Sequence, residues 1–414
     1  MKIKPALAAI SAITLLLCGC TKENAADSSS ELPSDMPYNR TVMETENGYY
    51  YNVSNPILSM RYREKSTGAD IFLCAKPECM HNGSDTCTAT YNFLSISNQI
   101  LYNGSIYFVA DISDKETTGY ALYKMSLDGT SLDKVGDVAK VKSALNSDKF
   151  FVGSLESFFI HKGYAYIPYT LGQNTYADFI EQGIVKMDIT TGETETIFKN
   201  NDFFSRRSMT LEGGCGDYIY YYDWEESDGG YYRQNIYSGE KEKLYQTDAF
   251  SSVSAFTEDE YYVISFDEND ELLVTVYSYT DFAPNGVVIE TGEKTLASGG
   301  IRAYEDKLIV CSNSEAAVYD KNGQKLGSIV AGEDADDYSG KAMYVYSANI
   351  SFDISNGKLY MKKYDEGLAS SVMYSCPIEE IASGNGKWEV AYTIAGYEAY
   401  WDEDPIFTKL NRGN

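Results

Sequence analysis

Two series of short turns alternate along this chain, and their regularity constrains its fold more than any other feature. The first series precedes aromatic runs, at Asn47-Gly48, Asn103-Gly104, Lys162-Gly163, Gly216-Asp217, Glu258-Asp259, Glu305-Asp306 and Asn356-Gly357. The second contains glycine, at Thr67-Gly68, Asp128-Gly129, Thr191-Gly192, Ser238-Gly239, Asn285-Gly286, Asn322-Gly323 and Asn385-Gly386. Asn-Gly and Asp-Gly favour primed hairpin turns, because both central positions need positive φ. Each pair of turns therefore predicts one unit of antiparallel strands.

The segments between the turns have the composition and alternation of β-strands. The chain has 37 Tyr and 17 Phe but 9 Pro, and runs such as residues 106–109 and 218–222 are rich in Tyr, Val and Ile. Short runs of this kind, bounded by Gly, Asn or Asp, are typical of strands. Segments with helical periodicity are almost absent, so the sequence predicts an all-β protein.

Seven units of this kind fit one architecture best. The repeat covers residues 40–400, which is about 51 residues per unit and close to the kelch and WD40 range. A unit of three or four antiparallel strands cannot bury both faces alone, whereas seven units around an axis bury them. We therefore expect a seven-bladed β-propeller over residues 41–414. Six or eight blades remain open because turns were counted, and a pair of β-sandwiches would also give short strands with regular turns.

One blade carries a family resemblance. Residues 122–130 resemble the LY-x-M-x-x-DG motif of TolB-like propellers, and of related propeller domains of unknown function in lipoproteins of anaerobic Firmicutes. Residues 184–192 are a degenerate second copy, and later blades match only in the turn. The resemblance implies a fold and no activity, because propellers host enzymes, receptors and scaffolds alike.

The start of the chain resembles the signal of a bacterial lipoprotein. The apolar run at residues 6–17 is too short to span a bilayer as a stable helix. It leads into Leu-Cys-Gly-Cys, which resembles a lipobox ending at Cys20. We expect a signal peptide at residues 1–19, lipidation of Cys20, including palmitate, and a flexible spacer at 20–40 that is rich in Ser, Asp, Glu and Pro. The alternative is an ordinary secretory signal with a chance cysteine.

Lipidation predicts an address outside the cytoplasm. Two acyl chains suffice for stable anchoring, so we expect a lipid-anchored protein on the outer face of the cell membrane or in the envelope. The formal net charge is −27. Such acidity repels nucleic acid and excludes it as a partner, although it could attract cations or basic partners. It also fits plain solubility outside the cell.

Three cysteines and one of the two histidines lie within 14 residues of one another. They are Cys74, Cys79, His81 and Cys87, in an expected inter-blade loop after the strand at residues 70–73. Structural zinc takes four tetrahedral sulfur and nitrogen ligands, so these four residues are candidate ligands of a structural zinc ion. Four protein ligands would leave no open position for a substrate, so we expect a stapled loop and no catalytic centre.

Two other interpretations of this segment stay open. Exported proteins favour disulfides, and a bond such as Cys74 to Cys87 would leave one cysteine over. The third interpretation is unpaired thiols in a packed loop. Similar segments occur in the Firmicutes lipoproteins that the blade motif resembles, and no function is attached to them there.

The remaining candidates have plainer interpretations. We expect Cys215, Cys311 and Cys376 to be small buried core residues, and His161 to be a turn residue. The acidic runs at residues 267–271, 333–337 and 402–404 lack the spacing of a calcium loop and are expected to be solvated. The tyrosines suit a sugar-binding face, but alternate strand positions first of all indicate sheet packing.

No motif of the sequence specifies a reaction. The chain contains no nucleophile elbow, no zincin helix and no phosphate-binding glycine loop. We therefore expect a non-catalytic propeller that binds an unknown protein or glycan ligand or acts as a scaffold. The alternative is a carbohydrate-active enzyme, a glycoside hydrolase or lyase, because carboxylates that converge from different blades leave no local signature.

Overall fold

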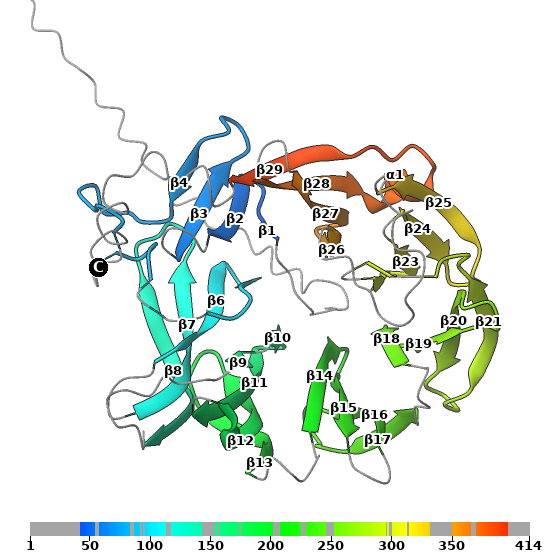
Figure 1. Cartoon of the computed structure of the whole chain (residues 1–414), viewed down its shortest axis with the longest axis horizontal. Coiled ribbons are helices and arrows are strands. Elements are labelled where there is room, and N and C mark those ends of the chain that lie inside the picture. Colours follow the sequence, from blue (N-terminus) through cyan, green and yellow to red (C-terminus); the bar gives the residue numbers. More distant parts are fainter. Residues whose placement is uncertain are drawn as a thin grey trace, which may run out of the picture.

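The computed structural model shows a ring of seven β-sheets, each built from consecutive strands (Figure 1). This arrangement confirms the seven-bladed, all-β propeller. The signal peptide, the spacer and Cys20 lie outside the described part of the chain. The structure describes residues 42–395 except 54–57, 83–86, 92, 94–95, 113–116, 143–153, 156–157, 174, 202–207, 225–228, 246–251, 295, 298–299, 313, 332–349 and 366–369.

Each blade is an antiparallel meander. The first three blades contain β1 (Met43–Glu44), β2 (Gly48–Val53), β3 (Ser59–Glu64), β4 (Asp70–Phe72); β5 (Ile100–Tyr102), β6 (Ser105–Asp111), β7 (Thr117–Ser126), β8 (Leu132–Lys142); and β10 (Phe159–His161), β11 (Tyr164–Gln173), β12 (Thr175–Asp188), β13 (Thr194–Asn200). The short strand β9 (Ser154–Leu155) pairs with β11. Blade 4 contains β14 (Ser208–Cys215), β15 (Tyr218–Trp224), β16 (Gly230–Asn235) and β17 (Lys241–Tyr245).

The last three blades repeat this order. They contain β18 (Ser252–Phe256), β19 (Glu260–Phe266), β20 (Leu272–Ser278), β21 (Pro284–Glu290); β22 (Ile301–Tyr304), β23 (Lys307–Cys311), β24 (Glu315–Asp320), β25 (Lys325–Val330); and β26 (Ile350–Ser355), β27 (Lys358–Asp365), β28 (Ser370–Pro377), β29 (Glu389–Ala395). One helix, α1 (Ile378–Ala382), connects β28 to β29.

The first series of turns links the first and second strands in all seven blades. At Asn103-Gly104 both residues have positive φ, 45° and 67°, as a primed hairpin turn requires. Six turns of the second series lie between the third and fourth strands. The turn predicted at Asn285-Gly286 in blade 5 is wrong, because both residues lie within β21. In that blade the turn lies between Ser278 and Pro284, where Phe282 takes the left-handed conformation with φ 54° and Ser278 N donates to Ala283 O.

Aromatic and aliphatic side chains between the blades form the core. Six buried clusters cover all seven blade-to-blade interfaces, including the one between blades 7 and 1. Tyr166, Tyr221 and Tyr261 are among the largest side chains with under 2% exposure. Burying one aromatic side chain stabilises a fold by about 1.5–3 kcal/mol. These tyrosines therefore hold the ring together and are not available as a sugar-stacking face.

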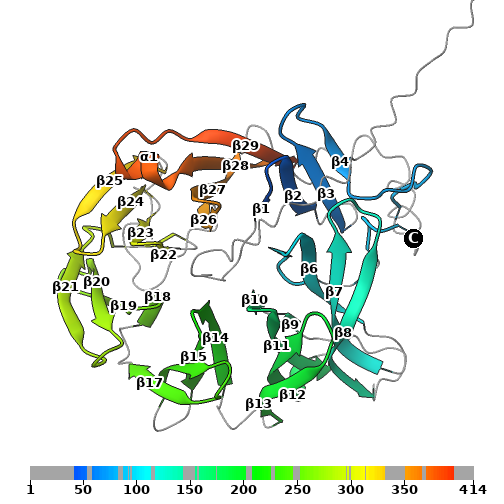
Figure 2. The ribbon, with the colours of Figure 1, turned by 180° about the vertical axis from the view of Figure 1, so that it is seen from behind.

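In the described residues, no sheet contains strands from both ends of the chain. Blade 1 is made only of β1–β4 and blade 7 only of β26–β29, and the two blades lie side by side in Figures 1 and 2. Glu44 of β1 is 6% exposed, accepts a hydrogen bond from Tyr360 and lies 3.0 Å from Lys358 Nζ. Lys65 Nζ lies 2.7 Å from the same carboxylate. A buried carboxylate thus joins the two ends of the ring.

Three cysteines and the second histidine lie in the core. Cys215, Cys311 and Cys376 are at most 1% exposed, which confirms their expected burial. His161 is not a turn residue: it ends β10, is 4% exposed, and its Nε2 lies 2.9 Å from Gly216 O. A Cβ at Gly214 would lie 2.5 Å from the imidazole, so a glycine across the blade interface makes room for the ring.

The acidic run at residues 267–271 forms the turn between β19 and β20. Asp267 Oδ1 accepts hydrogen bonds from the backbone N–H groups of Asn269 and Glu271, each at 2.8 Å. This carboxylate closes its own turn. The runs at 333–337 and 402–404 lie outside the described residues. Within the described residues no helix is long and apolar enough to cross a membrane.

Candidate metal centre

The segment with the candidate ligands leaves blade 1 and returns to it before the chain enters blade 2. Leu73 N donates to Met60 O of β3 at 3.0 Å. After the segment, Met60 N donates to Ala89 O at 2.8 Å, so the chain returns to the same strand. Both ends of the loop are therefore tied to β3, and the loop between them can close on itself.

A turn of blade 2 holds the loop from the other side. Gly129 O accepts hydrogen bonds from Ala75 N at 3.2 Å and from Thr88 Oγ1 at 2.7 Å. A Cβ at Gly129 would lie 2.6 Å from Leu73 O, and its φ is 68°. Only glycine meets both demands, the left-handed conformation and the close approach. The loop is thus clamped between blades 1 and 2.

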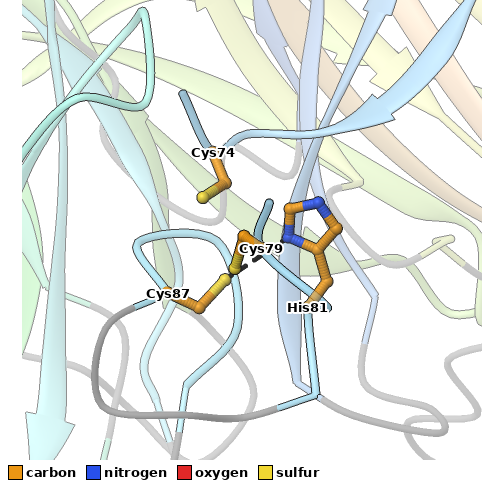
Figure 3. Close-up of side chains that lie close together, drawn as sticks. All are labelled: Cys74, Cys79, His81 and Cys87. Carbon is orange, nitrogen blue, oxygen red and sulfur yellow. Dashed lines mark hydrogen bonds between the residues drawn. The ribbon is translucent and has the colours of Figure 1, made fainter. Parts of the chain in front are cut away.

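Within this clamp the four candidate ligands converge (Figure 3). One ligand atom from each of Cys74, Cys79, His81 and Cys87 lies within 4.8 Å of the others. Cys87 Sγ and His81 Nδ1 are 3.5 Å apart. Around a tetrahedral zinc ion with Zn–S near 2.3 Å, neighbouring ligand atoms are about 3.5–3.8 Å apart. The side chains need only a small contraction to reach that geometry.

The imidazole of His81 is held by an aromatic stack. Its ring centroid is 4.5 Å from that of Phe72, with the planes 18° apart, and His81 has φ 49°. Burial and the nearby positive charge of Arg61 lower the pKa of His81. The neutral imidazole is the form that binds metals.

The surroundings lower the pKa of Cys74 and raise the pKa of Cys79. Burial raises the pKa of Cys74, but hydrogen bonds from the backbone of Lys76 and from Thr88 outweigh it and lower that pKa to about 7. A hydrogen bond from the His81 backbone lowers the pKa of Cys79, yet burial and the adjacent thiols of Cys87 and Cys74 raise it overall. Closely spaced thiols disfavour a second negative charge, and a bound cation would remove that penalty.

The positions of these four side chains favour a metal site over a disulfide. The three thiol sulfurs and one nitrogen of His81 all lie within 4.8 Å of one another. A disulfide would use two of them and leave the third sulfur and the facing His81 nitrogen without a role. A metal ion would use all four atoms. Sequence reasoning missed the residues that orient the ligands, Phe72 and Gly129, because no local signal marks them.

A separate titratable residue lies on the innermost strand of blade 4. Glu212 is the extra residue of a β-bulge, where the pairing of β14 with β15 shifts between Leu211 and Gly213. Burial raises its pKa to about 7, and the positive charge of Arg302, two blades away on β22, opposes that shift. Bulges often re-aim a side chain beside a functional site.

Comparison with known proteins gives the fold and no family. No family model matches the chain, and no curated protein matches it. A solved prolyl endopeptidase is 12% identical, with a TM-score of 0.51 over 86% of this chain and 49% of that one. A puromycin hydrolase is 9% identical, with a TM-score of 0.51 over 87% of this chain and 54% of that one. The chain thus spans about half the length of these enzymes.

The family suggested by the blade motif also has a solved representative. TolB from Acinetobacter baumannii is 11% identical over 72% of this chain and 64% of that chain, with a TM-score of 0.32. A score of that size supports no specific relationship. The prolyl endopeptidase and the puromycin hydrolase are far below 25% identical to this chain, so what they show is the β-propeller fold alone.

Proposed function

We propose that this protein is a lipid-anchored, extracytoplasmic propeller that acts by binding or scaffolding and carries a structural zinc ion at Cys74, Cys79, His81 and Cys87. The observation that carries the metal site is the convergence of four ligand atoms within 4.8 Å in a loop clamped by two blades. Four protein ligands complete a tetrahedral shell, so the ion would staple the loop and would not bind substrate.

Metal analysis of the mature chain, purified without chelator, tests the site. We expect about one zinc ion per chain, as a closed Cys3His site holds. Cys79→Ser should lose most of the metal, and Cys215→Ala, which removes a buried thiol far from the loop, should retain it. Metal-free protein in which two cluster thiols no longer react with a thiol reagent would instead establish a disulfide.

The lipid anchor is supported by the lipobox-like sequence that ends at Cys20. The full precursor expressed in a bacterial host should partition with membranes and incorporate labelled palmitate. Cys20→Ser should abolish both, whereas Cys18→Ser should preserve both, because the preceding cysteine is not the acceptor. Membrane retention of Cys20→Ser would exclude the proposed anchor.

A second candidate is a carbohydrate-active enzyme, and Glu212 is the observation that favours it. A carboxyl with a pKa of about 7 is protonated often enough at neutral pH to act as a general acid. Glycoside hydrolysis ordinarily needs a second carboxylate. Incubation with a panel of neutral and acidic polysaccharides tests the idea: products released by the wild type and not by Glu212→Gln would replace the binding function with an enzymatic one.

A further inference from the structure

We propose that Phe72, backed by Arg61, is a positioning residue that presents His81 to the metal through Nδ1. The inference rests on the proposed metal site and adds to it the coordinating atom and the residue that holds the plane of the imidazole. The close-up in Figure 3 shows one imidazole nitrogen facing the sulfurs and the other facing away. The facing atom is Nδ1, 3.5 Å from Cys87 Sγ.

The coordinating atom follows from where the ring is held. Coordination through Nε2 would require the imidazole to move so that its far edge reached the sulfurs. The Phe72 ring opposes that movement, because the two rings stack with planes 18° apart and centroids 4.5 Å apart. Stacking at this separation is a favourable arrangement of two rings, so tilting the imidazole away from Phe72 would lose that contact. Phe72 therefore fixes the plane in which the imidazole approaches the ion.

Phe72 is itself fixed by the outer hairpin of blade 1. Phe72 on β4 pairs directly with Arg61 on β3, and the guanidinium carbon lies 4.4 Å from the Phe72 ring centroid. Asp70 holds the guanidinium in turn, with Arg61 Nε 2.9 Å from Asp70 Oδ1. The contacts of Phe72 with Arg61 and with His81 thus connect the imidazole to the paired strands of the hairpin.

The neighbouring residue provides a matched control. Ile71 lies between Asp70 and Phe72 on the same three-residue strand and is 55% exposed. Successive side chains of a strand point to opposite faces, so Ile71 is directed away from the stack. A change at Ile71 perturbs β4 without touching the imidazole.

Two measurements on the mature full-length chain test the proposal. The first is the zinc dissociation constant by chelator competition. Outer-shell changes at metal-bound histidines typically weaken metal binding by about 10–100-fold, and we expect that loss for Phe72→Leu. Phe72→Tyr keeps the ring and should bind like the wild type, as should Ile71→Ala.

The second measurement identifies the coordinating nitrogen. The chain has only two histidines, so a sample with ¹⁵N-labelled histidine gives two imidazole patterns, and His161→Gln identifies the pattern of His81. Zinc should shift the Nδ1 resonance of His81 into the metal-bound range and leave Nε2 protonated. A merely structural role for Phe72 would not predict which nitrogen binds.

The outcomes separate the two proposals. If the wild type binds no metal, the structural zinc site fails and the positioning role fails with it. If the wild type binds zinc but Phe72→Leu binds equally well, or His81 binds through Nε2, only the positioning role is overturned. Weaker binding by Phe72→Leu together with Nδ1 coordination in the wild type supports it.

Discussion

At the scale of single residues, Gly129 decides how closely blades 1 and 2 can approach. Its carbonyl oxygen receives both ends of the cysteine loop, and its missing side chain leaves room for the Leu73 carbonyl. Blade motifs that end in Asp-Gly are therefore more than turn signals. Here the glycine is a contact surface for the preceding blade.

Gly129→Ala is expected to lower the free energy of unfolding by more than the cost of placing an alanine in the left-handed conformation. The left-handed conformation alone costs a non-glycine residue about 1 kcal/mol, and the added Cβ would also lie 2.6 Å from Leu73 O. Gly68→Ala is the control, because Gly68 has φ 72° in the equivalent turn of blade 1 and no heavy atom within 4 Å of its added Cβ. Urea unfolding of both variants measures the difference. If both variants lose the same free energy of unfolding, the close approach of Gly129 to Leu73 O does not contribute to stability.

The candidate ligands could be predicted from the sequence because they are local. Cys74, Cys79, His81 and Cys87 share one short segment with an unusual density of ligand residues. Phe72 lies just before that segment, and Gly129 lies 42 residues after Cys87. Neither residue has a side chain that can bind a metal. Their roles depend on strand register and on blade packing, which a pattern of residue types along the chain does not contain.

At the scale of elements, the first hairpin of every blade was predictable, and the last hairpin, between the third and fourth strands, was less so. At Asn103-Gly104, Lys162-Gly163 and Asn356-Gly357 both turn residues have positive φ, as a primed two-residue hairpin turn requires. The connections of the last hairpin tolerate length changes, and blade 7 contains α1 between β28 and β29. A helix of five residues has too few positions to show a helical period. It forms because the side chains of Ile378 and Ile381 are buried in the apolar cluster between blades 6 and 7.

Helix α1 should stabilise the interface between blades 6 and 7 through Ile381. This side chain is 0% exposed and belongs to the buried cluster shared by those blades. We expect Ile381→Ala to lower the free energy of unfolding by about 2–5 kcal/mol, as other large-to-small core changes do. Glu380→Ala, at the exposed neighbouring position, should change it by less than about 0.5 kcal/mol. Thermal unfolding checks the pair, and an unchanged melting temperature for Ile381→Ala would contradict the packing role.

At the scale of the whole molecule, the ring depends on one seam. The other interfaces join blades that follow each other in sequence. Blades 1 and 7 instead come from the two ends of the described chain and pack against each other through one apolar cluster. Besides the apolar cluster, Glu44 joins the seam to Lys65, Lys358 and Tyr360. Losing a partner from a buried ion pair costs about 3–5 kcal/mol, so this carboxylate is a sensitive point of the fold.

The seam predicts a stability difference that depends on pH. Burial alone would raise the pKa of Glu44, but hydrogen bonds from Lys65, Tyr360 and Lys358 outweigh it and lower that pKa below its ordinary 4.5. A lowered folded-state pKa gives stability that is present above 4.5 and is lost as the pH falls through the folded value. Glu44→Gln should therefore be less stable than the wild type at pH 7 by about 3 kcal/mol, and the gap should narrow below pH 4.5.

Urea unfolding at several pH values measures this gap. Glu46→Gln is the control, because Glu46 lies in the same turn and is exposed. A gap between Glu44→Gln and the wild type that stays constant down to acidic pH would show that the carboxylate's charge does not contribute to closure.

Contiguous blades also bear on how such a ring can change over evolution. Because each sheet is built from one uninterrupted stretch of about 50 residues, copying or deleting one stretch adds or removes a complete sheet. No neighbouring sheet loses a strand in the process. Among the described residues, blades 1 and 7 come from opposite ends of the chain. The residues of their seam must therefore stay matched when the copy number of the unit changes.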